Sequence, residues 1–297
     1  MERIIDYEIT SEYEGLSIER FLLLKGYTRQ NIVDLKKIYR SILINDNWMH
    51  MQDLLAAGDT LIVHIVEDAN SENIPPVELP FPICFEDEDI VIVDKPAGMP
   101  IHPSLNNYEN TLGNAAAYYY QSQGQSFIYR CVNRLDRDTS GLTIIAKHMV
   151  AAGNLYNQMT NRQIHREYVA IVEGSGLPDE ATIDYPIGRK TGSTIEREVN
   201  LETGEKAITH FKVCERKDDM TLIKLHLDTG RTHQIRVHMS YIGHPLVGDW
   251  LYNPESKLMN RQALHSAKLQ FIHPITGENM IIESKMPEDM LSLWKSS

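Results

Sequence analysis

The stretch VNRLDRDTSGLTIIAKH, Val132 to His148, combines a cluster of charged residues with a predicted buried strand. Arg134, Asp136 and Arg137 crowd together, a Thr-Ser-Gly turn follows, and the apolar run LTIIA predicts a buried strand. Asp136 is therefore expected on a loop at a sheet edge, where an aspartate is ionised and a nearby arginine keeps it so. Such a carboxylate can act as nucleophile or general base. The alternative is a weak surface salt bridge, and this stretch alone leaves both open.

The length and composition are those of an ordinary globular protein, and the net charge is negative. The chain has 297 residues, 42% of them hydrophobic and 24% charged, which argues against disorder and allows one large domain or a large and a small one. The net charge of −12 excludes a protein that is basic all over. It leaves room for a basic cleft on an acidic body.

Cysteine usage and the first residues indicate the compartment. Cys84, Cys131 and Cys214 lie far apart with no CxxC pair, so reduced, mostly buried thiols are expected rather than disulfides or zinc ligands. The start MERIIDYEITSEYEG is acidic and has no apolar signal region, and no run of about 18 apolar residues follows. We expect a cytoplasmic protein without a membrane partner.

Residues 1–66 are predicted to form a small α/β domain. Apolar spacing predicts a helix over 17–26, with Gly26 as its stop, and a second helix over 28–39 that begins at Thr28. Strands are expected at 41–46 and after the Gly58-Asp59 turn. The second helix carries a basic strip made of Arg29, Lys36, Lys37 and Arg40.

A linker and a larger domain follow. Residues 67–82 contain four prolines and are interpreted as a semi-rigid linker, because proline denies hydrogen bonds to a sheet. From 83 to 297 many strand-like runs alternate with fewer helical stretches. This pattern predicts an α+β domain built on a mostly antiparallel, mixed sheet.

A second candidate stretch, LDTGRTHQIRVHMSYIGHPLVGD, runs from Leu227 to Asp249. A strand ends at a Gly turn, and Thr232 is expected to cap a helix that carries Arg236, a residue type suited to gripping a carboxylate or phosphate. His233 and His238 are five positions apart and so point to different sides of a helix. We expect structural hydrogen bonds for them and no metal site.

Two further stretches contain candidate functional residues. In HREYVAIVEG, His165 to Gly174, Arg166 and Tyr168 lie on one side of a strand, and the tyrosine either stacks on a base or belongs to the core. VIVDKPAGMPIHP, Val91 to Pro103, is a strand with a proline-stiffened loop, for which a structural turn is the alternative.

No P-loop, dinucleotide-binding glycine pattern, HExxH or GxSxG occurs, so nucleotide hydrolysis, hydride transfer and zinc chemistry lose support.

Taken together, these stretches resemble the RluA-type pseudouridine synthases. The central family motif appears as NRLDRDTSGL, with Asn133 where histidine is usual. Further motifs follow in the family order, from about Phe85 to Pro274: VDKPAGMPIHP, REYVAIVEG, GRTHQIRVHM, HPLVGD and RQALHSAKLQFIHP. Residues 1–66 resemble a small RNA-binding domain shared with a ribosomal small-subunit protein.

The resemblance implies isomerisation of uridine in RNA to pseudouridine, with no cofactor and no metal. Asp136 matches the catalytic aspartate, which acts as nucleophile or assists proton removal from the ribose; Tyr168 matches the residue that packs on the base, and Arg236 matches the arginine that pairs with the carboxylate. Arg134 is placed to fill the space that a flipped uridine leaves. The other expected RNA contacts are Arg231, His233, Lys36, Lys37 and Arg40.

The implied substrate is ribosomal RNA of the large subunit, with transfer RNA as the alternative, and a monomer suffices. Asn133 is expected to be tolerated because it can still hydrogen-bond. Two rival readings are an idle RNA-binding or chaperone protein on the same fold and a small-molecule hydrolase that uses a carboxylate. The first predicts RNA binding without turnover, and the second predicts no dependence on RNA.

Overall fold

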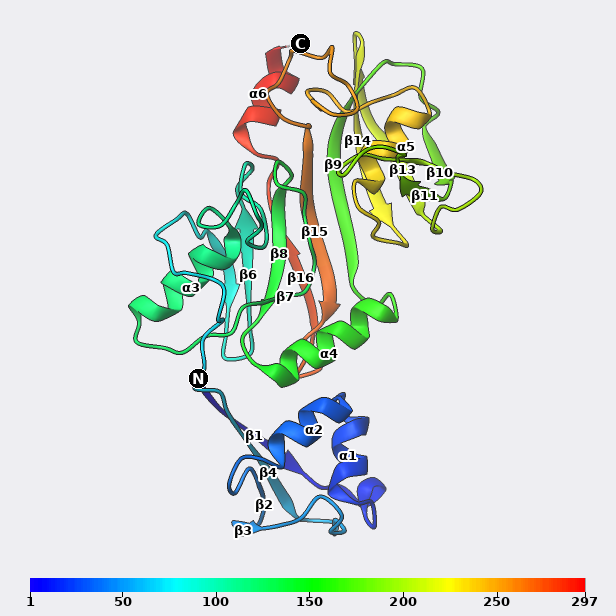
Figure 1. The fold of residues 1–297 in the computed structure, drawn as a ribbon. Coiled ribbons are helices and arrows are strands. Elements are labelled where there is room, and N and C mark those ends of the chain that lie inside the picture. Colours follow the sequence, from blue (N-terminus) through cyan, green and yellow to red (C-terminus); the bar gives the residue numbers. More distant parts are fainter. Residues whose placement is uncertain (297) are drawn as a thin grey trace.

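Two sheets of different size divide the chain in the computed structural model, which describes residues 1–296 (Figure 1). The first sheet is antiparallel with the order β1-β4-β2-β3. Its strands are β1 (Glu2–Glu8), β2 (Ile42–Ile44), β3 (Asn47–Trp48) and β4 (Thr60–Val66). The β2 and β4 strands were predicted from the sequence, whereas β1 was not.

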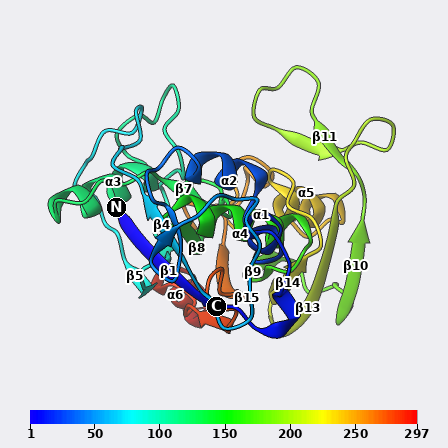
Figure 2. The same cartoon turned by 90° about the horizontal axis from the view of Figure 1, so that it is seen from below.

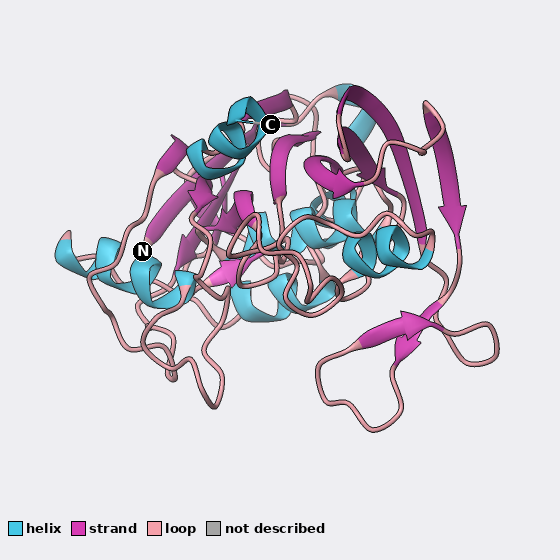
Figure 3. Ribbon diagram, turned by 90° about the horizontal axis from the view of Figure 1, so that it is seen from above, coloured by secondary structure: helices cyan, strands magenta, loops and turns pink. Residues whose placement is uncertain are grey.

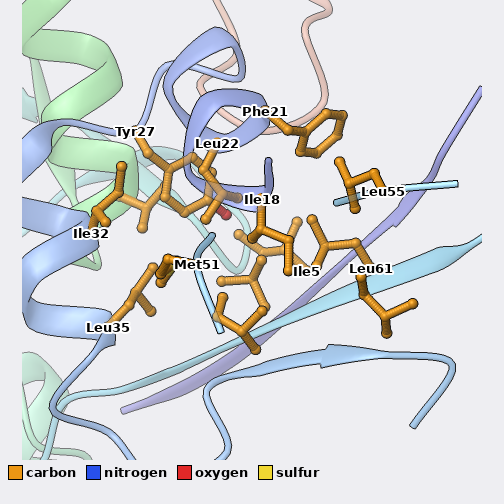
Figure 4. Close-up of a cluster of buried hydrophobic side chains, with 14 of the residues drawn as sticks. Ile5, Ile18, Phe21, Leu22, Tyr27, Ile32, Leu35, Met51, Leu55 and Leu61 are labelled. Atoms are coloured by element: carbon orange, nitrogen blue, oxygen red, sulfur yellow. The ribbon is translucent and has the colours of Figure 1, made fainter. Parts of the chain in front are cut away.

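Two short helices cover this small sheet, after a single 3₁₀ turn, η1 (Ser11–Tyr13). The helix α1 (Ile18–Leu24) is capped by the Ser17 side chain, and α2 (Arg29–Leu35) begins with a capping box between Thr28 and Asn31, as Thr28 predicted. Gly26, with φ of +86°, makes the turn between them. Their apolar faces pack on the strands in one buried cluster, including Phe21 and Leu22 of α1 (Figure 4).

The second helix is shorter than predicted. It ends at Leu35, so Lys36, Lys37 and Arg40 lie in the turn that follows it, and Arg40 adopts a positive φ of 55°. The prediction of a basic strip on this helix is therefore wrong, because only Arg29 of the four basic residues lies within α2.

The small domain rests on helix α4 (Met149–Thr160) of the larger one (Figure 1). Asn31 Nδ2 donates to the Met149 carbonyl at 3.1 Å, and Val150 is buried in the small domain's own core. A second tie joins Arg3 of β1 to Asp89, whose carboxylate accepts from Nε at 2.8 Å. The two parts thus share buried contacts.

The proline-rich segment 67–82 contains no helix or strand, but it packs against the large domain. Ile74 and Leu79 contact a buried apolar cluster of the large domain, and the Pro75 carbonyl accepts a hydrogen bond from Asn114 Nδ2 at 2.7 Å. The segment is therefore held along the surface of the large domain.

The large sheet is mixed and mostly antiparallel, which confirms the predicted α+β class. Its main order is β10-β13-β14-β9-β15-β8-β6-β5. In addition, β16 pairs with β15 and β7 pairs with β8, and within the described residues only the β15–β8 pair is parallel. The strands are β5 (Ile83–Glu86), β6 (Ile90–Lys95), β7 (Arg130–Cys131), β8 (Ser140–Ala146), β9 (His165–Glu173), β10 (Glu180–Asp184), β13 (Ile208–Lys217), β14 (Met220–Leu227), β15 (Leu264–Ile272) and β16 (Asn279–Glu283).

Helices cover both faces of this sheet, because alternate residues of each strand point to opposite sides. Helix α4 packs on Ile90 and Ile92, whereas α3 (Leu112–Ser122) packs on Val91 and Val93 of the same strand. Because both sides are covered, every residue of β8 is buried, including the polar Ser140 and Thr143.

The other half of the sheet repeats this arrangement. Helix α5 (Gln234–Tyr241) packs on the face of β9 that carries Tyr168 and Ala170, and α6 (Glu288–Ser296) packs on Ile171 from the opposite face. The C-terminal helix α6 was not among the sequence predictions.

A two-stranded arm, β11 (Ile187–Arg189) with β12 (Arg197–Val199), projects from the body beyond β10 (Figure 2). Viewed from the other side, the arm again stands clear of the large sheet (Figure 3). Tyr252 reaches it, since its hydroxyl accepts a hydrogen bond from the Arg197 amide at 2.9 Å.

The cysteines are free in the described chain, but their expected burial is wrong for two of them. Cys84 and Cys214 are exposed, and Cys131 is half-buried.

Candidate active site

The loop between β7 and β8 carries Asp136, as the sequence predicted, and buried polar side chains hold it from behind. Asn133 is buried; its Oδ1 accepts from the Ile144 amide at 2.8 Å and its Nδ2 donates to the Leu142 carbonyl at 3.1 Å. Asparagine at this position therefore ties the loop to β8 through both ends of its amide.

The Thr-Ser-Gly turn ends in Gly141, the second residue of β8, where β8 pairs with β15. Gly141 has φ of +114°, and a Cβ added there would lie 2.3 Å from the Ser266 carbonyl oxygen. The glycine of the Thr-Ser-Gly turn thus permits both the backbone conformation and the close parallel pairing with β15.

A buried lysine supports the same loop from β6. Lys95 Nζ donates to the carbonyls of Pro96, Met99 and Arg137 at 2.8, 2.8 and 3.0 Å. Burial lowers the pKa of Lys95 to about 7. The structural turn considered for this stretch is correct, and its lysine also fixes the backbone next to Asp136.

Asp136 forms an ion pair with Arg236, although the two residues are far apart in the sequence. Arg236 Nη1 donates to Asp136 Oδ2 at 3.0 Å; the arginine side chain is 4% exposed and the aspartate 25%. The carboxylate is thus oriented by a buried guanidinium and still reachable from solvent. The alternative of a surface salt bridge with sequence neighbours is therefore wrong: Asp136 pairs with the buried Arg236, and Arg137 pairs with Asp138 at 2.8 Å.

Asp249 and Tyr252 hold Arg236 in place, and sequence analysis missed both roles. The fully buried carboxylate of Asp249 accepts from Nε at 2.7 Å and from Nη2 at 2.8 Å, and the guanidinium lies 5.0 Å from the centre of the Tyr252 ring. Burial opposes the charged form, but Asp249 and Asp136 together raise the pKa of Arg236. The available signal was the aspartate of HPLVGD, which ends the second candidate stretch.

Helix α5 begins one residue later than the Thr232 cap predicted. Its N-cap residue is His233, in the left-handed conformation with φ of 59°. His233 Nδ1 lies 2.9 Å from the Tyr252 hydroxyl, and Nε2 lies 3.9 Å from Asp136 Oδ2. Burial lowers the pKa of His233, so its imidazole is neutral at pH 7.

His238 has the structural role expected of it. Its Nδ1 lies 2.9 Å from Thr209 Oγ1, and its Nε2 lies 2.9 Å from the Tyr185 carbonyl oxygen. Both ring nitrogens are therefore engaged away from Asp136.

Tyr168 shares a cavity with Asp136. It is 4% exposed, and burial raises the pKa of its phenol. The cavity is also lined by Arg166, so the two residues do lie on one side of β9. The core alternative considered for the tyrosine is confirmed, because its ring packs in the α5 core cluster, and stacking on a base stays a prediction.

The mouth of the site is wide and rich in arginine. A cavity of about 670 Å³ and a neighbouring one of about 540 Å³ share Arg134, Leu135 and Asp136. Arg134 is exposed, and Arg231 lines the larger cavity while pairing with Glu205. Asp136 therefore borders both cavities.

The basic residues of the small domain lie apart from this site. Lys36 and Lys37 line a separate cavity, and they pair with Glu19 and Asp34 at 3.2 and 2.7 Å. Arg40 donates to the Asp46 carbonyl. The structure therefore brings together Asp136, Tyr168, Arg236, Arg134, Arg231 and His233, but not these three.

No helix within residues 1–296 is long and apolar enough to cross a membrane.

Comparison with known proteins identifies the class. The family model described as RNA pseudouridylate synthase matches residues 89–241. The chain is 42% identical over 270 residues to the uncharacterised RNA pseudouridine synthase YjbO of Bacillus subtilis, covering 91% of this chain and 95% of that one. It is 38% identical to ribosomal large subunit pseudouridine synthase D of Pseudomonas aeruginosa, covering 82% and 79%.

A solved structure agrees. Human RNA pseudouridylate synthase domain containing 1 superimposes with a TM-score of 0.60 at 26% identity, covering 71% of this chain and 85% of that one. The chain belongs to the RNA pseudouridine synthase family, isomerases that convert uridine in RNA to pseudouridine. Within that family it is an RluA-type synthase, which confirms the resemblance recognised in its motifs.

Proposed function

We propose that Asp136 is the catalytic residue of this synthase and that large-subunit ribosomal RNA is its substrate. The observation that carries the assignment is the 3.0 Å pair between Asp136 Oδ2 and the buried Arg236, inside a cavity that Tyr168 also lines. Relatives named ribosomal large subunit pseudouridine synthase D support the choice of RNA. Transfer RNA is the alternative substrate.

Each neighbour of Asp136 has a proposed role. The carboxylate attacks the ribose C1′ or takes part in proton removal from the ribose, while the N1–C1′ bond breaks. The uracil turns against the Tyr168 ring, C5 bonds to C1′, and the hydrogen on C5 leaves as a proton while N1 gains one. Arg134 fills the space of the flipped nucleotide, and Arg231 and His233 contact the RNA beside it.

The domain assignment is part of the same proposal. Residues 1–66 form the RNA-binding domain, 67–82 the linker and 83–297 the catalytic domain. Lys36, Lys37 and Arg40 contact phosphates from the small domain, so RNA affinity is expected to fall as salt rises. A single copy contains every proposed catalytic group, which supports a monomer, and its RNA substrate supports a cytoplasmic location.

The test is tritium release from RNA labelled at uridine C5. Ribosomal and transfer RNA are prepared from cells that lack the gene and are incubated separately with wild type, Asp136→Asn and Asp138→Asn. Wild type and Asp138→Asn are expected to release tritium from ribosomal RNA, and Asp136→Asn to bind that RNA without release. Release by Asp136→Asn would refute the catalytic assignment, and release from transfer RNA alone would replace the substrate.

A further inference from the structure

A cluster of two histidines and one aspartate lies on the face of the large sheet that faces away from α5. His210 of β13 and His226 of β14 are direct cross-strand partners, and Asp228 follows on the same face of the chain two residues later. Tyr168 and Leu225, which are register partners, point to the α5 side. The two histidines therefore point to the opposite face of the sheet from Tyr168.

The three side chains bring possible metal-ligand atoms close together. One nitrogen from each histidine and one carboxylate oxygen of Asp228 lie within 4.8 Å of one another. His210 Nε2 and Asp228 Oδ2 are 3.2 Å apart. Ligands about 2.1 Å from a tetrahedral ion are separated by about 3.4 Å, so this spacing is close to that of two ligands of one ion.

A neighbouring hydroxyl orients the first histidine. Thr182 Oγ1 on β10 lies 2.8 Å from His210 Nδ1, which leaves Nε2 for the cluster. Metal-binding histidines commonly use their other nitrogen in such a bond, because it sets the tautomer and the ring orientation. The His210 and His226 rings are nearly parallel, with centroids 4.3 Å apart.

One acidic neighbour of the cluster, on β9, already has a partner of its own. Glu167 is the register partner of His226 on β9 but pairs with Lys224 at 3.2 Å. Two imidazoles and one carboxylate therefore remain available, and His226 is exposed to solvent.

The second cluster of this kind is already saturated. Asp87, Asp89 and His273 also gather, but His273 donates to Asp87, and Asp89 accepts from both Arg3 and His148. These bonds are structural and leave no room for an ion.

We propose that His210, His226 and Asp228 form a binding site for a zinc-class divalent ion. Two nitrogen donors and one oxygen donor suit Zn²⁺, Co²⁺ or Ni²⁺, whereas Mg²⁺ and Ca²⁺ prefer sites made of oxygen alone. A bound ion bridges β13 and β14 beside the end of β14 that borders the large cavity, since Asp228 also lines that cavity. Its role is to stabilise this edge of the RNA-facing cleft.

The test is a Co²⁺ titration of the full-length, tag-free chain, followed by visible absorption and by competition with Zn²⁺. One ion per chain is expected to bind to wild type, and His210→Gln and His226→Gln are expected to lose it. His50→Gln is the matched control, since His50 is a histidine of the small domain beside Trp48, and this variant is expected to keep the ion.

Thermal unfolding supplies a second readout that does not depend on activity. Zn²⁺ at about 100 times its Kd is expected to raise the Tm of wild type by about 2 °C or more and to leave His226→Gln unchanged, with Mg²⁺ inactive on both. Co²⁺ binding retained in both histidine variants, or a wild-type Kd weaker than about 1 mM, would overturn the proposal.

Discussion

The guanidinium of Arg236 is clamped by Asp249, which accepts from its Nε at 2.7 Å and from its Nη2 at 2.8 Å. This two-bond contact uses one edge of the planar group and leaves Nη1 aimed at Asp136. Asp249 also accepts from the amides of Leu251 and Tyr252, so its own position is fixed by the turn after HPLVGD. The orientation of Asp136 therefore depends on Asp249, which acts on it through the buried Arg236.

The first prediction concerns the contact between Asp249 and Arg236. Asp249→Asn keeps the size of the side chain but loses the charge and one of the two acceptors, so Arg236 is expected to turn and to release Asp136 from its orientation. The single-turnover rate of tritium release is expected to fall about 10- to 100-fold, with RNA affinity nearly unchanged.

Its control is Asp179→Asn, which breaks an exposed pair with Arg216 and is expected to leave the rate unchanged. An Asp249→Asn enzyme with the wild-type rate would show that Asp136 needs no fixed arginine.

The second prediction concerns pH and the junction between the two domains. Burial opposes ionisation, yet the hydrogen bonds from His148 and Arg3 lower the pKa of Asp89 to about 2. An unfolded aspartate titrates near about 3.9, so this group stabilises the fold above that pH and loses its contribution as the pH falls toward 2. Wild type is therefore expected to lose stability in that window, measured by denaturant unfolding at a series of pH values.

Asp89→Asn is expected to flatten this acid-dependent loss and to lower the free energy of unfolding at pH 7 by about 1–3 kcal/mol. Glu88→Gln is the matched control, because Glu88 is an exposed partner of the same Arg3. It is expected to change stability by less than about 0.5 kcal/mol. Equal acid sensitivity in wild type and Asp89→Asn would contradict the assignment.

The third prediction concerns the glycine of the Thr-Ser-Gly turn. Gly141→Ala places a Cβ 2.3 Å from the Ser266 carbonyl oxygen at a positive φ, so β8 and β15 must separate. We expect a loss of about 3 kcal/mol or more in the free energy of unfolding, measured by denaturant titration. Gly124→Ala, also at positive φ but with nothing within 4 Å, is expected to cost only about 1 kcal/mol. Similar losses in the two variants would assign the whole cost to backbone conformation.

Local patterns in the sequence were sufficient for much of the fold. The cap at Thr28, the stop at Gly26 and the buried strand after Asp136 depend on neighbours within a few residues, and all three are present in the structure. The end of α2 and the start of α5 were misplaced, because helix ends depend on what the following turn packs against. The strand β1 was missed, since its pairing partner β4 lies at the far end of the small domain.

The family, the α+β class and the residue types that meet in the site could be predicted from the chain alone, because ordered motifs and local periodicity are properties of the chain. The partners that these residues take arise only when the chain is folded. Arg236 could be expected to hold Asp136, but its clamp by Asp249 and the meeting of His210 with His226 arise from helix packing and strand register. Such contacts join residues that are distant in the chain, and their geometry is set by the packing of whole elements rather than by local sequence.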